Sequence, residues 1–143
     1  MLSYTELAVT LAEADAYAAL RAWADWATGD DAARTAALHR SQDYIAATYN
    51  HLWAEEWDND AAPDEVKYAI IEGARREKAS AGSLQPDVTV GKIKTRVKVD
   101  AIDISYAQGI GAAAMRPDIP IIGNLLAPHL TKSWGASVDL LRV

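Results

Sequence analysis

The segment PDEVKYAIIEGARREKA, residues 63–79, carries the clearest helical pattern in this chain of 143 residues. Acidic residues follow Pro63, which suits the first turn of a helix, and basic residues precede Gly82, which is a common stop signal. Its small and apolar residues recur at helical spacing and predict one buried side, made of Val66, Ala69, Ile70, Gly73 and Ala74. The segment therefore predicts an amphipathic helix that packs against other helices.

Two further helices are predicted before this segment. Thr10 and Glu13 have the spacing of a capping box, and a helix is expected from there until Gly29 ends it. A second helix is expected from about Asp31 to Trp53. The apolar stripe of the second helix consists of Leu38, Ile45, Tyr49 and Leu52.

A short fourth helix is predicted in IPIIGNLLAPHL, residues 119–130, where it stops near Pro128. Its apolar positions are Ile121, Ile122, Leu125 and Leu126. The predicted fold class is thus mainly α, a small helical bundle of about four helices with one β-hairpin and an extended tail. Residues 1–130 are expected to form one helical domain that includes the hairpin, and residues 131–143 an extended C-terminal tail.

The predicted hairpin covers about residues 91–106. A turn at Asp100-Ala101 pairs Val99 with Ile102 and Val97 with Ile104 on one face, and Lys98 with Asp103 and Arg96 with Ser105 on the other. The first strand carries a cation at every second position: Lys92, Lys94, Arg96 and Lys98. Such lysines often keep an edge strand soluble, and they also suit contact with a phosphate or an acidic partner.

The charge of the chain is unevenly distributed. The formal net charge is −6; residues 1–66 hold 13 acidic and 3 basic residues, for −10, and residues 67–143 hold 7 and 11, for +4. This asymmetry suits side-by-side contact between like subunits or contact with an oppositely charged partner, although composition alone favours two solvated faces of one domain. An acidic protein fits poorly with free nucleic-acid binding as its main role. Cysteine is absent, which excludes disulfides and thiolate metal sites, and the apolar runs are too short to span a membrane.

No catalytic, cofactor or metal site is predicted. Gly109, Gly111 and Ala114 fit a dinucleotide-binding spacing, but prolines follow and no second parallel strand appears. The acidic stretch EEWDND, residues 55–60, lacks the alternating ligands and central glycine of a calcium loop, and the three histidines are scattered. The tryptophan pairs at residues 23/26 and 53/57 are read as core or interface anchors.

The order of these segments resembles the head–tail connector proteins (adaptor or head completion proteins) of long-tailed bacteriophages and related gene transfer agents. Some of these proteins are labelled DnaT-like single-stranded-DNA-binding proteins. The likeness covers residues 3–130 and lies in LAEADAYAALRAW, AARTAALHRSQDYIAATY, PDEVKYAIIEGARREKA, KIKTRVKVDAIDISYA and IIGNLLAPHL. The loop after Tyr49 is richer in acid than the family pattern, and the tail after Leu130 matches no pattern.

The resemblance implies a structural virion protein rather than an enzyme, made in the host cytoplasm and placed in the neck of the virion. It implies a homo-oligomeric ring, dodecameric by that likeness, under the portal protein. The ring extends the channel for packaged double-stranded DNA and docks a stopper or tail completion protein. Our hypothesis for the subunit and portal interface is the basic strand together with the apolar tail residues Trp134, Val138, Leu140, Leu141 and Val143. The alternative is a single-stranded-DNA-binding module that uses the basic hairpin.

Overall fold

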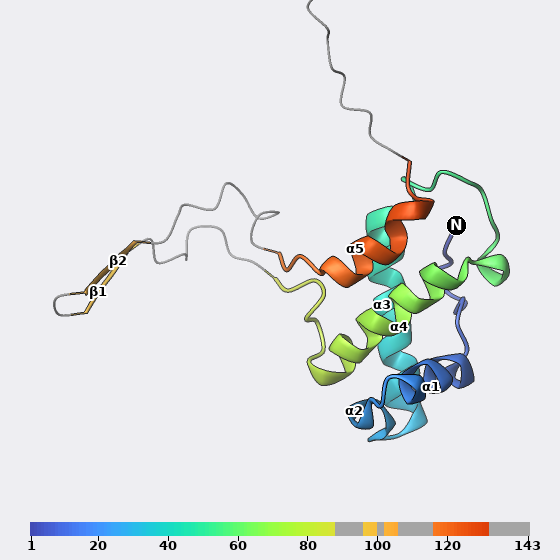
Figure 1. Ribbon diagram of the computed structural model, residues 1–143, viewed down its shortest axis with the longest axis horizontal. Coiled ribbons are helices and arrows are strands. Elements are labelled where there is room, and N and C mark those ends of the chain that lie inside the picture. The colour runs from blue at the N-terminus through green and yellow to red at the C-terminus, as the bar shows by residue number, and fades with distance from the viewer. Residues whose placement is uncertain (88–95, 100–101, 106–115, 132–143) are drawn as a thin grey trace, which may run out of the picture.

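Two long helices, α3 (Asp31–Tyr49) and α4 (Asp64–Ala79), cross at the centre of the fold (Figure 1). The computed structural model describes residues 1–87, 96–99, 102–105 and 116–131. Leu38 and Ile45 of α3 and Val66 and Ile70 of α4 are completely buried in one core. The predicted fold class, a mainly α small helical bundle, is confirmed, and so is the predicted buried side of α4.

The crossing of α3 and α4 is close because of a glycine. A Cβ atom added at Gly73 would lie 2.2 Å from Oγ of Ser41 and 3.3 Å from Cδ1 of Leu84. Real Cβ atoms do not approach other atoms to 2.2 Å, so only glycine fits at this position without a shift of the neighbouring side chains or backbone. Oγ of Ser41 is itself buried without a hydrogen-bond partner among the described residues.

The single helix expected before Gly29 is two helices, α1 (Leu11–Leu20) and α2 (Ala24–Ala27). Thr10 and Glu13 form the predicted capping box at the start of α1. At its end, the amide of Trp23 donates to the carbonyl of Ala18, and the amide of Ala22 to that of Ala19, each at 3.1 Å. These two bonds form a Schellman motif with Ala22 at a φ of 52°, a position that glycine usually fills. The prediction of one helix was wrong because alanine gives no stop signal.

The helix α3 begins at Asp31, as predicted, with the side chain of Asp30 accepting a hydrogen bond from the amide of Ala33. It ends at Tyr49, before the predicted Trp53. The residue after its last turn, Asn50, accepts from the amide of Leu2 at 3.0 Å and donates to its carbonyl at 2.9 Å. The chain therefore leaves the helix where Asn50 binds the N-terminal segment.

A buried glutamine also holds the N-terminal segment against α3. Gln42 is 1% exposed, and its amide nitrogen donates to the carbonyls of Ser3 and Glu6, each at 2.6 Å. Its amide oxygen accepts from the amide of Ala8 at 2.8 Å. One side chain thus satisfies three backbone groups of a segment that has no regular secondary structure, while Leu2 and Val9 fill the core beside it.

The helix α5 (Pro120–Leu126) packs against α4 and continues into the 3₁₀ turn η3 (Ala127–His129) (Figure 1). Another 3₁₀ turn, η1 (Asn59–Ala61), precedes α4. Of the apolar positions of α5, Ile122 and Leu126 are buried, whereas Ile121 is 38% exposed. An isolated β-bridge joins Trp53 to Leu130 and brings the end of the described chain to the loop after α3. No helix among the described residues is long and apolar enough to cross a membrane.

The strands β1 (Arg96–Val99) and β2 (Ile102–Ser105) form an antiparallel hairpin. Its register pairs Val97 with Ile104 and Val99 with Ile102, as the alternating pattern predicts. The predicted turn at residues 100–101, residues 107–115 of the predicted loop, and the tail from residue 132 lie outside the described residues.

Candidate functional site

The structure places only part of the predicted interface. Arg96 and Lys98 lie on β1, opposite Ser105 and Asp103 respectively, which confirms the predicted pairing. Lys92 and Lys94 lie outside the described residues, and so do the tail residues Trp134, Val138, Leu140, Leu141 and Val143. The structure also describes the surface of the helical body, where the basic strand or the tail of another copy would bind.

The segment that carries the hairpin leaves the body at a turn held by Glu77. This carboxylate is 3% exposed; it accepts from the amides of Gly82 at 2.8 Å and Leu84 at 2.9 Å, and from Nε of Arg40 at 3.1 Å. Leu84 borders the same shallow cleft as Ile119, just before α5. The outgoing and returning ends of the hairpin segment therefore meet at the C-terminal end of α4, a place that we call the hairpin root.

A larger cleft lies at the other end of α4, after α3. Its volume is about 590 Å³, and its lining includes Trp53 and Trp57, whose ring centroids are 5.1 Å apart. Nε1 of Trp53 donates to Oδ1 of Asn50 at 3.0 Å, which fixes the indole beside the end of α3. Tyr49 extends the aromatic row, with its ring centroid 6.4 Å from that of Trp53. We call this cleft the aromatic groove.

The aromatic groove is rich in carboxylates. Glu55, Glu56 and Asp58 line it and are exposed. Neither lysine nor arginine lines it among the described residues. Its basic groups there are the imidazole of His51 and the amino group of Met1, which donates to the carbonyl of Trp57. Aromatic faces together with carboxylates attract cations, guanidinium groups above all.

A second, smaller groove between α1 and α4 has mixed charge. It encloses about 370 Å³ beside the rings of Tyr17 and Tyr68, and both Glu13 and Lys67 line it. The guanidinium carbon of Arg21 lies 3.3 Å from the centroid of the Tyr17 ring and covers that face. Burial, and then the charge of Glu72, raise the pKa of Tyr17 to about 12. A groove with both charge signs and a covered ring is a poor platform for a partner of one charge.

Part of the signal for the aromatic groove is present in the sequence. Trp53 and Trp57 are predicted to be core or interface anchors, and both are partly buried at the edge of the core. The acidic stretch at residues 55–60 has no predicted role. Folding of the loop against Met1 and Asn50 places its carboxylates around the indoles, and local periodicity does not report such a contact. No group of three or more metal-ligating side chains occurs among the residues that the structure describes.

Comparisons with known proteins place this chain in one family. No curated protein and no solved structure matches it. The family described as "Putative DnaT-like ssDNA binding protein" matches residues 51–143, more than half of the chain, and this region contains α4, the hairpin, α5 and all of the lining of the aromatic groove except Met1 and Asn50. The chain therefore belongs to that DnaT-like family.

Proposed function

We propose that this protein is a structural virion subunit, the head–tail connector adaptor that forms a ring under the portal. In this role it extends the channel for packaged double-stranded DNA and docks a stopper or tail completion protein in the virion neck. The order of its sequence segments supports the proposal, and so does the fold, a small helical bundle joined to a β-hairpin with the predicted register.

The observation that carries the proposal is the separation of charge between the helical body and the hairpin. Two cations of α4 form ion pairs within the body: Lys67 binds Glu13 at 3.0 Å, and Arg75 binds Asp25 at 2.8 Å. By sequence, residues 88–115 hold four basic and two acidic residues, for +2, whereas residues 51–62 hold four acidic and no basic residues, for −4. A basic arm and an acidic loop on each subunit suit contacts between neighbouring copies.

The ring is proposed to hold twelve copies, with the hairpin and the tail as assembly elements. The tail residues 138–143 would add an extended edge to the sheet of a partner, either the portal or a neighbouring subunit. Backbone hydrogen bonds would supply the affinity of this contact, and its apolar side chains the specificity.

Electron microscopy of the protein mixed with the portal protein from the same genome tests this function. The expected result is a collar of added density on the narrow end of the portal. A control with portal alone shows whether that density comes from the added chain. Bare portals at saturating protein would contradict the adaptor role.

A second function, binding of single-stranded DNA, is favoured by the description of the matching family, because the matched residues include both strands of the hairpin. In that case the four alternating cations contact phosphates. The logarithm of the binding constant then falls linearly with the logarithm of the salt concentration. The expected slope is about −3, because each phosphate contact contributes about −0.7. A titration of labelled single-stranded DNA at several salt concentrations measures this slope. Tight binding with that slope, together with bare portals, would favour this function over the adaptor.

A further inference from the structure

We infer that the aromatic groove receives the basic strand β1 of a second copy of this chain. The inference deepens the proposed ring assembly, on which it rests, by naming the acceptor surface and the inserted group. The acceptor is the groove lined by Trp53, Trp57 and three carboxylates, and the inserted element is the strand that carries Arg96 and Lys98.

The chemistry of the two surfaces is complementary. The groove offers two indole rings at 5.1 Å and the carboxylates of Glu55, Glu56 and Asp58. A guanidinium group stacks on an indole face and binds a carboxylate through two parallel hydrogen bonds, so arginine suits such a groove better than lysine does. The groove volume of about 590 Å³ lies within the range of roughly 300–1,000 Å³ that is typical of ligand sites.

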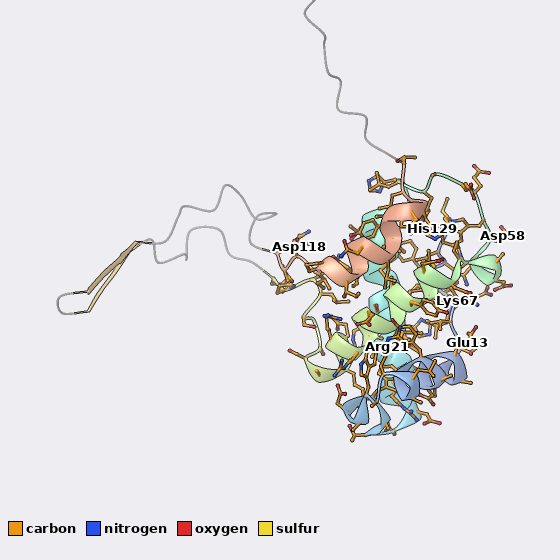
Figure 2. All side chains as sticks on the ribbon, in the orientation of Figure 1. Glu13, Arg21, Asp58, Lys67, Asp118 and His129 are labelled. Atoms are coloured by element: carbon orange, nitrogen blue, oxygen red, sulfur yellow. The ribbon has the colours of Figure 1, made fainter. Side chains whose placement is uncertain are left out.

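The two surfaces lie on opposite sides of the bundle, an arrangement that suits contact between neighbouring copies. Figure 2 places Asp58, on the rim of the groove, and Asp118, beside the hairpin root, on opposite sides of the bundle. The helix α4, with 16 residues, separates the two places by about 24 Å at about 1.5 Å per residue. A contact between opposite sides of identical subunits is heterologous, and repeated heterologous contacts generate rings when the rotation closes.

Disulfide trapping tests the contact directly. The chain contains no cysteine, so each variant carries only the introduced thiol. Full-length Glu56→Cys protein is mixed with full-length Arg96→Cys protein, with and without portal, and oxidised mildly. We expect disulfide-linked dimers that join the two variants. The matched control pairs Arg96→Cys with Asp43→Cys, an exposed position on α3 that does not line the groove, and should give at least about tenfold fewer dimers.

Charge reversal supplies an independent test. Glu55→Lys with Glu56→Lys should weaken association of the copies at least about tenfold, because like charges would then meet. Lys94→Glu with Arg96→Glu should do the same. Arg96 lies opposite Ser105, so its reversal places no like charge directly opposite it on β2. Mixing the two reversed proteins should restore their association. Asp43→Lys with Asp87→Lys changes the charge equally at exposed positions away from the groove and should have no effect.

The outcomes separate this inference from the proposed function. In one outcome, the wild-type and the Glu55→Lys/Glu56→Lys proteins form equal collars on the portal, and the Glu56→Cys and Arg96→Cys proteins form no mixed dimer. The groove is then not the acceptor, and the adaptor role stands. If portals remain bare while the two thiol variants still couple, the adaptor role fails and the contact between copies stands. Coupling of the Arg96→Cys thiol to the portal or only within a doubly substituted chain would overturn the inference.

Discussion

Ala22 shows how a single residue divides a helix that the sequence pattern presents as continuous. It adopts a left-handed conformation, at a φ of 52°, at the end of α1. A side chain in this conformation costs about 1–2 kcal/mol relative to the right-handed helix. The two hydrogen bonds of the Schellman motif and the burial of Trp26 at 1% exposure offset this cost.

Ala22→Gly is therefore expected to stabilise the fold by about 0.5–1 kcal/mol, because glycine removes the strain but adds freedom to the unfolded chain. Urea denaturation measures the free energy of unfolding. The matched control is Ala16→Gly at an exposed position inside α1, which should destabilise by about 1 kcal/mol. Equal losses in both variants would contradict the role assigned to Ala22.

Gly73 is constrained by space. Gly73→Ala should destabilise the protein by about 2 kcal/mol, because the new methyl group overlaps Oγ of Ser41 at 2.2 Å. The same change in a Ser41→Ala background should cost at least about 1 kcal/mol less, since the overlapping oxygen is absent. The control is Gly123→Ala, where no atom of the described residues outside the adjoining turns of its own helix lies within 4 Å of the added carbon; it should stabilise by about 0.5 kcal/mol. A loss that is the same with and without Ser41 would show that the two positions do not compete for space.

Among the elements of the fold, the N-terminal segment depends on one side chain of α3. Gln42→Ala should destabilise the protein by about 3 kcal/mol, because the carbonyl of Ser3 and the buried amide of Ala8 lose their partner, while the carbonyl of Glu6 keeps only its bond from Asn59. Chemical denaturation measures the loss, and hydrogen exchange of the Ala8 amide should accelerate. Asp43→Ala, at the next and exposed position, should change stability by less than about 0.5 kcal/mol. Unchanged exchange at Ala8 would mean that the segment is held by Leu2 and Val9 alone.

A local sequence pattern specifies the hairpin, whereas contacts of one buried side chain specify its root. The register of β1 and β2 follows from side-chain alternation, which leaves one arrangement with Val97 and Val99 opposite apolar partners. The root depends on Glu77, whose carboxylate reaches two amides in the turn that follows its own helix. Helical periodicity places Glu77 on α4 but does not predict these contacts.

For the molecule and its assembly, the separation of charge predicts strong salt dependence. Opposite charges at the edge of the aromatic groove are screened as the Debye length falls from about 10 Å at 0.1 M salt to about 3 Å at 1 M. Association of copies should therefore weaken at least about tenfold over this range, as measured by sedimentation of the wild-type protein with portal. The Glu55→Lys/Glu56→Lys protein should show little further loss with salt. If salt does not weaken association of the wild-type protein, the association depends instead on apolar contacts of the tail.

Local sequence patterns are sufficient to predict the mainly α class, the starts of α1 and α3, the buried side of α4 and the register of the hairpin. These features depend on caps, on helical periodicity and on alternation, which act over a few residues. The break at Ala22, the early end of α3 at Asn50 and the aromatic groove emerge only in the folded chain. Each of these depends on contacts between residues far apart in the chain, such as Asn50 with Leu2, or on packing that outweighs a local conformational cost. The surface on which the proposed assembly depends is of this second kind, because its carboxylates and indoles meet only once the loop has folded against the N-terminal segment.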